Sequence, residues 1–345
     1  MRFGFDERQI EFRNQLRALT EKSCTSAELR AAGESELGWS PARWAALAEM
    51  GVVGLTVPES YDGLGFGLVD LVLLLEETGR SGLPEPLLET TALAVPLLGQ
   101  ISGAGAEELR GRWLPKVAAG AAVMAVGTAA MPSVPGAGGA DLLLLERDGE
   151  IHAVEAAATV RRARRSLDGT RRPAEVSWEP SPATRVVAAE DAQGVLASLA
   201  DRAAMSTGAV LVGVADRLIT MTAEYAVERV QFGKPIGSFQ AVKHHLANAL
   251  IRLEFARPAV YRAAWSLDVG DPGAGWHASM AKALAAEAAT GAARMALQVH
   301  GAIGYTWEHD LQLWMKRAWS LSAAWGDAGF HRARVLERML ATAKA

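Results

Sequence analysis

The sequence predicts a mainly α-helical protein that carries a small β-domain in the middle of the chain. Apolar residues recur at helical spacing through most of residues 1–123 and 191–345, whereas residues 124–190 hold short apolar runs between proline and glycine. Alanine and glycine are frequent in the last part, and such small side chains permit close helix packing. We expect an N-terminal helical domain over 1–123, a middle β-domain over 124–190 and a C-terminal four-helix bundle over 191–345.

The first domain is expected to consist of helices joined by glycine-rich turns. Helical spacing begins in IEFRNQLRALTEK, continues through Trp44 and Leu47, and stops at Gly51. A turn is predicted for VPESYDGLGFG. A buried helix ended by Gly79 and Gly82 is predicted for LVDLVLLLEETGRSGLP. Two more helices are predicted for PLLETTALAVPLLGQ and EELRGRWLPKVAAG.

The middle domain is expected to hold several short strands. Two apolar runs flank Asp148 and Gly149 in DLLLLERDGEIHAVE, which predicts a hairpin. Further strands are predicted for AEVSWEP and RVVAA, and a loop for MPSVPGAGGA. At about 60 residues the domain is small for an independent core.

The last domain is expected to be a set of long helices. In the first of them, apolar residues recur at alternating steps of four and three from Thr207 to Tyr225. Further helices are predicted for FQAVKHHLANALIRLEFARPAVYRAAWSL, HASMAKALAAEAATGAARMALQVHG, LQLWMKRAWSLSAAW and GFHRARVLERMLATAKA. Gly301 is expected to close the second of these four. The stretch RVQFGKPIGSFQ, residues 229–240, interrupts the helical pattern and is called the 229–240 segment below.

Composition excludes several functional classes. The formal net charge of -4 gives no sign of nucleic-acid binding. Cys24 is the single cysteine, so an internal disulfide is impossible, and the histidines show no metal-binding spacing. The N-terminus lacks the apolar run of a signal peptide, and no stretch of ~20 apolar residues predicts a membrane span. We expect a soluble, cytoplasmic protein without a metal or membrane contact.

Two groups of basic residues have alternative interpretations. The arginines near residue 165 are predicted to lie in a solvated loop, with contact to an acidic ligand as the alternative. His331 and Arg332 are predicted to lie at the surface, with contact to a ligand phosphate as the alternative. The first group consists of Arg161, Arg162, Arg164, Arg165, Arg171 and Arg172.

The order of domains and three sequence motifs resemble the acyl-CoA dehydrogenase family over nearly the whole chain. The stretch VPESYDGLGFG is similar to the family's Val-Pro-Glu-x-Tyr-Gly-Gly-Leu-Gly. The 229–240 segment is similar to the signature Arg-x-x-Phe-Gly-x-x-Ile-x-x-Phe-Gln, and QVHGAIGY to Gln-x-x-Gly-Gly-x-Gly-Tyr. The resemblance implies the family's three-domain fold, bound FAD and oxidation of acyl-CoA thioesters to 2,3-enoyl-CoA.

The resemblance also assigns cofactor-binding residues, which in the family reach the FAD of a neighbouring subunit. The donors of Arg229 suit a diphosphate, Phe232 and Phe239 offer flat faces, and side-chain amides can donate and accept hydrogen bonds. Alternatively, Arg229 complements a helix dipole and the two phenylalanines belong to the core. The assigned residues are Arg229, Gln231, Phe232, Phe239, Gln240, Gln298 and Gly301.

The sequence departs from the family in the middle domain and at the catalytic base. VGTAAMPSVPGAGGADLLLLE replaces the flavin-binding Thr-Glu-Pro-x-Gly-Ser-Asp and Lys-x-Trp-Ile-Thr-Asn motifs, so a truncated domain is expected that cannot cradle the isoalloxazine. The family's usual glutamate base aligns with Trp325 or Gly326, and its alternative base position with Ala203. Asp327 is the nearest carboxylate to the first position, but a helix-capping role is favoured for it over that of a base. The catalytic residue of this chain is therefore unknown.

Three interpretations follow. The favoured one is the smaller subunit of an α2β2 acyl-CoA dehydrogenase, because the short chain and TWEHDLQLWMKRA resemble actinobacterial enzymes of steroid catabolism. A longer acyl-CoA dehydrogenase subunit would then supply the base and the isoalloxazine pocket, and the substrate would be a bulky CoA thioester. A self-sufficient homotetrameric dehydrogenase is the second interpretation. The third is a non-redox protein of the same fold, either hydratase-like or structural.

Overall fold

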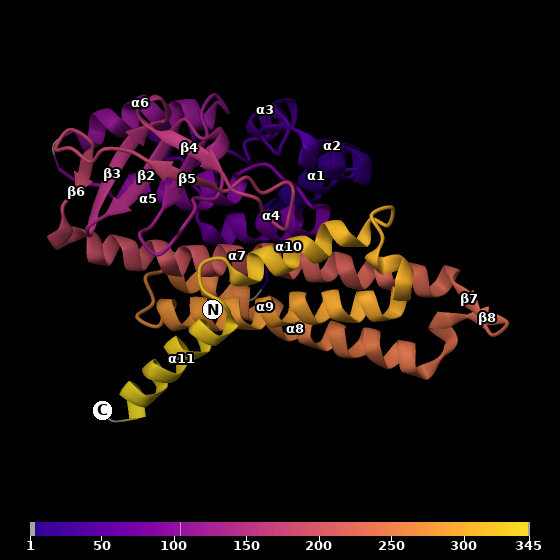
Figure 1. Cartoon of the computed structure of the whole chain (residues 1–345). Coiled ribbons are helices and arrows are strands. Elements are labelled where there is room, and N and C mark those ends of the chain that lie inside the picture. Colours follow the sequence, from indigo (N-terminus) through magenta and orange to yellow (C-terminus); the bar gives the residue numbers. More distant parts are fainter. Residues whose placement is uncertain (1–3, 104, 344–345) are drawn as a thin grey trace. The chain divides into compact units, whose positions relative to one another are not determined.

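The computed structural model describes residues 4–103 and 105–343. The chain is mainly helical with small sheets, which confirms the predicted fold class (Figure 1). It divides into two compact units. Unit 1 contains the residues up to Leu29, residues 72–83 and the residues from Ala204 onward. Unit 2 contains 30–71 and 84–203. The division into three domains stays a prediction.

The N-terminal part is helical, as predicted. Asp6 begins the first helix through a capping box with Gln9, in which the Asp6 side chain accepts from the Gln9 N–H. Ser40 likewise accepts from the Arg43 N–H at the start of the third helix. The helices are α1 (Glu7–Ser23), α2 (Ser26–Glu34), α3 (Pro41–Glu49), η1 (Glu59–Tyr61), α4 (Leu68–Ser81), η2 (Leu88–Ala94), α5 (Val95–Gln100) and α6 (Ala106–Ala118).

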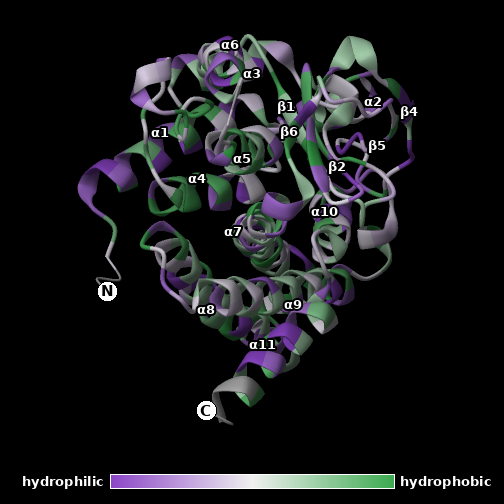
Figure 2. Cartoon of the chain, turned by 90° about the vertical axis from the view of Figure 1, so that its left-hand side faces the viewer, coloured by the Kyte–Doolittle hydropathy of each residue, from purple (hydrophilic) through white to green (hydrophobic). Residues whose placement is uncertain are grey.

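Unit 2 holds a four-stranded sheet in the order β1-β2-β3-β6. β1 (Met124–Gly127) runs parallel to β2 (Leu142–Arg147), and β3 (Glu150–Glu155) and β6 (Arg185–Val187) are antiparallel to their neighbours. Asp148 and Gly149 form the turn between β2 and β3 with φ of 54° and 80°, which confirms the predicted hairpin. The apolar residues of β1 and β2, green in Figure 2, are buried.

Shorter elements complete unit 2 around this sheet. η2 packs against β1, where the Thr90 hydroxyl donates to Met124 O and accepts from Met124 N–H. A second sheet pairs β4 (Val160–Ala163) with β5 (Ala174–Ser177). Short helices η3 (Ala137–Gly139) and η4 (Ala156–Ala158) lie in the connections.

The C-terminal part consists of the long helices that the sequence predicts. They are α7 (Ala189–Glu228), α8 (Gln240–Asp268), α9 (Ala274–His300), α10 (Leu311–Ala323) and α11 (Ala328–Ala343). The periodic residues Thr207, Leu211, Val214 and Leu218 of α7 are buried. Gly301 ends α9 at φ 66°, as predicted.

Gly79 has a different role from the predicted helix terminator. It lies inside α4, and a Cβ at this position would be 1.9 Å from Val210 O of α7. Gly213 of α7 faces α4 in the same way, because its Cβ would be 1.8 Å from Glu76 O. The two glycines therefore let the backbones of α4 and α7 touch, a contact between distant parts of the sequence.

The solvated loop predicted near 165 is confirmed only in part, because Arg164 and Arg165 lie in an exposed connection, whereas Arg161 lies in β4 and Arg172 is half-buried. Arg161 donates to the carbonyls of Ala137 and Ala140, over 2.8 and 3.0 Å. Arg172 donates to Gly33 O and Ser35 O, over 2.7 and 2.6 Å. Arginine carries several donors in a fixed arrangement, and here these donors bind backbone carbonyls within or just after α2 and η3. Arg162 and Arg165 remain exposed.

One described helix is long and apolar enough to cross a membrane by composition, and it is α7. Its most apolar 18-residue window has a mean hydropathy of 1.3, so the expectation that no such window exists is corrected. However, 61% of that window is buried inside the protein, as in a helix that packs in a core.

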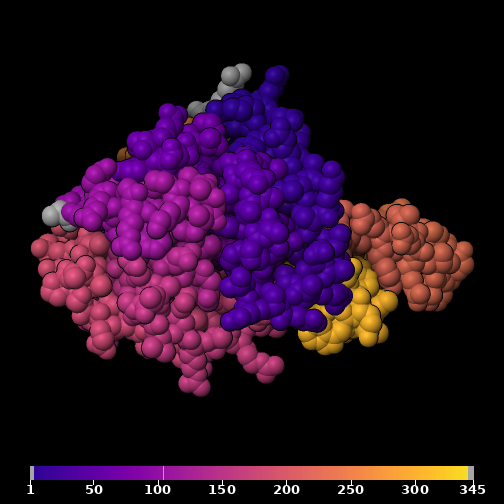
Figure 3. Space-filling view, turned by 90° about the horizontal axis from the view of Figure 1, so that it is seen from above, coloured from indigo at the N-terminus to yellow at the C-terminus, as the bar shows by residue number. Residues whose placement is uncertain are grey.

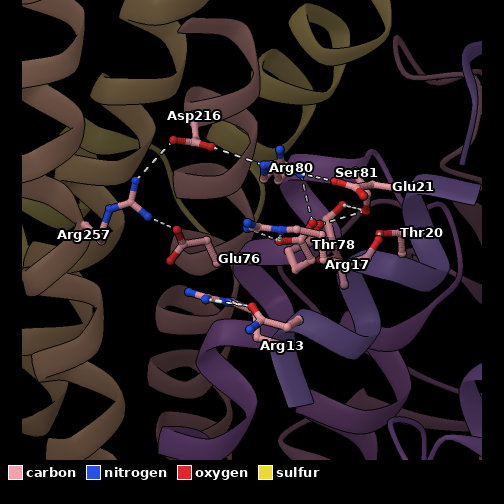
Figure 4. Close-up of polar contacts among 12 residues, drawn as sticks. Arg13, Arg17, Thr20, Glu21, Glu76, Thr78, Arg80, Ser81, Asp216 and Arg257 are labelled. Atoms are coloured by element: carbon pink, nitrogen blue, oxygen red, sulfur yellow. Dashed lines mark hydrogen bonds and ion pairs between the residues drawn. The ribbon is translucent and has the colours of Figure 1, made fainter. Parts of the chain in front are cut away.

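A network of ion pairs joins α1, α4, α7 and α8 in unit 1 (Figure 4). Glu77, which is 1% exposed, accepts from Arg17 over 2.6 Å. Asp216 lies 3.6 Å from Arg80 and 3.4 Å from Arg257, and burial raises the pKa of its carboxyl. Glu76 accepts from Arg257 and from the Tyr261 hydroxyl. Each of these carboxylates has a cationic partner, so the network holds four helices together.

Candidate functional site

The 229–240 segment folds as a tight hairpin between α7 and α8. β7 (Val230–Gln231) pairs with β8 (Lys234–Pro235), and Phe232 and Gly233 form the turn with φ of 53° and 78°. Positive φ at both turn residues is the geometry of a type I′ hairpin, for which phenylalanine is an unfavourable choice. Phe232 is also 92% exposed. The tip of the hairpin therefore presents an aromatic residue that is both exposed and held in an unfavourable backbone conformation.

The polar side chains of this segment are also open. In Figure 3 the segment belongs to the orange atoms at the right of the picture. Arg229 and Gln240 are exposed, and their side chains have no hydrogen-bond or ion-pair partner among the residues that the structure describes. Gln231 donates to Val230 O over 2.7 Å. The Lys234 ammonium lies 4.4 Å from the Phe239 ring centre, so the segment carries two cations and two aromatic rings.

The two glycines of this segment, Gly233 and Gly237, differ in their surroundings. A Cβ there would lie 3.0 Å from Ala226 O, so Gly237 allows the segment to pack on the end of α7. Gly233 has nothing within 4 Å of such a Cβ and leaves the outer side of the turn open.

The second predicted cofactor segment, residues 298–301, lies at the end of α9 beside the end of α7. Gln298 and Gly301 are exposed, and no described residue binds the Gln298 amide. The ring of His300 stacks on Tyr225 of α7, with ring centres 4.2 Å apart and an interplanar angle of 18°. Tyr225 lies one turn before Arg229 and accepts its backbone N–H over 2.8 Å. The structure thus brings the two predicted segments together.

The loop between α10 and α11 occupies the position where the family's glutamate base was expected. Asp327 lies just before α11, and its carboxylate accepts from the Phe330 N–H over 2.8 Å, which confirms the capping role. Trp325 has φ of 57° and Gly326 of 94°, so the loop is held in a left-handed conformation. At the alternative base position, Ala203 is 0% exposed.

Two buried side chains hold this loop. Lys282 of α9 is 0% exposed and donates to Ser322 O and Gly326 O over 3.0 and 2.9 Å. Burial lowers the pKa of its ammonium to about 8, and the charge of Asp327 opposes that shift. His331 of α11 is 1% exposed, and its Nε2 lies 2.9 Å from Trp325 O.

The expected surface position of His331 is therefore wrong. Its ring faces inward because the first turn of α11 packs against the loop, and burial lowers the pKa of the imidazole to about 4. Arg332, the next residue, is exposed and pairs with Glu287. The contacts of Lys282 and His331 were not predicted.

The middle domain offers a groove of about 590 Å³ beside the ends of β1, β2 and β5. Four carboxylates and one arginine line it: Glu146, Asp148, Glu175, Glu179 and Arg147. The loop after β1 is bound to its own chain, since Val134 pairs with Ala174 and Arg161 donates to the carbonyls of Ala137 and Ala140. The carboxylates of this groove would repel the diphosphate and the electron-rich edge of a flavin, and the neighbouring loop already bonds to its own chain. The groove therefore does not fit the cofactor.

The fold and these residues define a class of protein, and comparison with family models identifies it. The N-terminal domain model of acyl-CoA dehydrogenase matches residues 6–121, and the C-terminal domain model matches residues 194–340. The chain belongs to the acyl-CoA dehydrogenase family, flavoprotein oxidoreductases that act on a CH–CH bond of acyl-CoA.

Individual relatives and solved structures are similar to this chain over most of its length. It is 36% identical to acyl-CoA dehydrogenase IpdE2 of Mycolicibacterium smegmatis, over 91% of this chain and 92% of that protein. Its fold is similar to the Tcur3481-Tcur3483 steroid acyl-CoA dehydrogenase, with a TM-score of 0.87, 26% identity and coverage of 98% and 99%. The ChsE4-ChsE5 complex of Mycobacterium tuberculosis gives a TM-score of 0.86, 26% identity and coverage of 99% of both chains.

Proposed function

We propose that this chain is the smaller subunit of a heteromeric, FAD-dependent acyl-CoA dehydrogenase and contributes one side of a flavin site seated mainly in a longer partner subunit. The observation that carries the proposal is the open state of the 229–240 segment, with Phe232 92% exposed. The soluble, cytoplasmic location expected from the sequence is part of the same proposal.

The residues of the two segments fit the cofactor. Arg229 offers paired donors for the diphosphate, and Lys234 adds positive charge. The rings of Phe232 and Phe239 lie at 89° to each other with centres 6.1 Å apart, so one of them can face a flat group while the other supports it. Gln231, Gln240, Gln298 and the backbone at Gly301 offer further hydrogen-bonding groups. Bound FAD would supply the two-electron acceptor for the oxidation.

A partner subunit is proposed because the described residues offer neither a base nor an isoalloxazine pocket at the expected positions. Its middle-domain groove is acidic, and the two positions expected for a base hold a capped loop and a buried alanine. A carboxylate base and an isoalloxazine pocket must therefore come from another polypeptide, for which a longer acyl-CoA dehydrogenase is the simplest candidate. The relatives support this, since two similar structures carry paired names, Tcur3481-Tcur3483 and ChsE4-ChsE5.

A bulky, steroid-derived CoA thioester is the proposed substrate class. The support is the name of one similar structure, a steroid acyl-CoA dehydrogenase. We propose α,β-dehydrogenation as the reaction, in which the partner's base removes the α-proton and a hydride leaves the β-carbon.

Purification of the chain alone and with a longer relative tests this proposal. Flavin and acyl-CoA oxidation should appear only in the co-purified complex. Flavin and activity in the chain alone would favour a homotetrameric enzyme. A complex that forms without flavin would favour a non-redox or structural role.

Asp327→Asn tests whether this chain supplies the base. Turnover of the complex should stay within about twofold of wild type, because asparagine can still cap α11 and the partner holds the base. The loss of a positioned base commonly lowers the rate by about 10²–10⁴-fold. A fall of roughly 10³-fold in turnover, with the complex intact, would show that Asp327 is the base.

A further inference from the structure

His300 lies between the two segments that the proposed function assigns to the cofactor. It is the last residue of α9, follows Gln298 by two positions and is 5% exposed. One face of its ring stacks on Tyr225 at the end of α7. Its other ring contact is with His309, whose centre lies 4.8 Å away at an interplanar angle of 76°. The imidazole is therefore enclosed by three separate parts of unit 1.

The hydrogen bonds of His300 define an uncharged ring with one free nitrogen. Nδ1 lies 2.8 Å from Ala296 O and so carries the proton. Nε2 is buried and has no partner among the described residues. His309 cannot supply one through Nδ1, because that atom accepts the Leu311 N–H over 3.1 Å. An unpaired nitrogen in a buried ring is unfavourable, so the Nδ1 hydrogen bond and the packing of the ring must together offset its cost.

The stack connects the two predicted segments through their own backbones. On one side, Tyr225 accepts the backbone N–H of Arg229, whose carbonyl in turn accepts from Ile236 N–H over 2.8 Å. On the other side, Gly304 packs on His300, where a Cβ would lie 3.2 Å from the His300 Cβ. The stacked ring thus lies between the end of α7, which is hydrogen-bonded to the hairpin, and the turn after α9.

We propose that His300 is a positioning residue which, through its stack on Tyr225, locks the 229–240 and 298–301 segments into one binding surface. The importance of that surface rests on the proposed function, whereas the coupling between the segments is a property of this chain alone. If His300 only filled space in the core, its substitution would change the stability of one segment without the other, or of neither.

A fall in pH should weaken the contact between His300 and Tyr225, an effect that is not expected if His300 only fills space in the core. Burial lowers the pKa of His300, the bond to Ala296 O opposes this, and the nearby His309 lowers it further. Tyr225 faces the ring from α7 as an uncharged group. Protonation of His300 must place a charge on the enclosed Nε2. The stack is therefore intact at neutral pH and weakens as the pH falls below the ordinary histidine pKa of about 6.5.

Hydrogen–deuterium exchange on the chain alone tests the coupling. Peptides covering 225–240 and 298–310 are compared at pH 7.5 and pH 5, after correction for intrinsic exchange. His300→Ala removes the stacked ring, and His300→Phe keeps a flat ring that cannot be protonated. His245→Ala is the control, because His245 is exposed on α8.

In wild type, both peptides should lose protection together at pH 5. In His300→Ala both should exchange about tenfold faster at pH 7.5, because the stacked ring that protects both of them is lost. His300→Phe should stay protected at both pH values, and His245→Ala should behave as wild type. A response in only one peptide, or an acid response that persists in His300→Phe, contradicts the proposal.

Flavin retention separates this inference from the proposed function. In the co-purified complex, His300→Ala should lose FAD more readily than wild type, and His300→Phe should retain it. If the wild-type complex holds no flavin, the proposed function fails, but the exchange experiment still decides whether His300 couples the segments.

Discussion

Arg229→Ala should weaken FAD binding to the co-purified complex by roughly 10–100-fold, because a hydrogen-bonded ion pair with a phosphate contributes about 1.5–3 kcal/mol. The Arg229 guanidinium is exposed and has no partner within the described chain, so its loss leaves no group unpaired in the fold. The melting temperature of the chain should therefore remain near that of wild type. Bound flavin after gel filtration, measured by its visible absorbance, gives the result.

Arg165→Ala is a matched control for this variant. Arg165 is an exposed arginine in unit 2, so its removal changes the net charge by the same amount. The control should retain flavin as wild type does. Normal flavin content in Arg229→Ala would remove Arg229 from the cofactor site, and equal losses in both variants would point to net charge instead.

Acid should destabilise the chain through His331 by about 3 kcal/mol between pH 6.5 and pH 4. Burial lowers the pKa of His331 to about 4, against an ordinary value of 6.5. Within this range the unfolded chain binds a proton that the folded chain does not. The contribution of His331 to the free energy of unfolding is therefore fully present above pH 6.5. It is lost as the pH falls toward 4, at about 1.4 kcal/mol per pH unit.

His331→Gln tests this assignment. Glutamine does not titrate and can still donate to Trp325 O, so the variant should lose most of this acid dependence while keeping the loop fold. Urea unfolding at several pH values measures the effect. His245→Gln, at an exposed position of α8, should retain the wild-type pH dependence. An unchanged slope in His331→Gln would mean that other groups cause the acid sensitivity.

Features set by local sequence could be predicted. Gly301 ends α9, and Asp148 with Gly149 forms the hairpin, because each conformation depends on the residue itself. Asp327 caps α11 for the same reason. Phe232 at the tip of the 229–240 segment is exposed, so the alternative that it belongs to the core is wrong, whereas its contact with a cofactor stays a prediction.

Features that depend on contacts between distant helices could not be predicted. Gly79 was expected to end α4 but instead admits the backbone of α7, and nothing next to it in the sequence indicates α7. In the sequence, His331 stands among arginines at the start of a helix, which predicts an exposed position, yet its ring faces the loop at Trp325. The position of Lys282 could have been noticed in the sequence, because it is a single lysine on an alanine-rich helix. A buried lysine needs hydrogen-bond or ionic partners, so its contacts could have been sought.

The most direct test of the central claim is the flavin content of the chain with and without its proposed partner. The chain would be produced alone and together with a longer acyl-CoA dehydrogenase that carries the flavin motifs and the glutamate base. We expect a colourless chain alone, and a yellow complex that oxidises acyl-CoA with an artificial electron acceptor. A yellow and active preparation of the chain alone would contradict it.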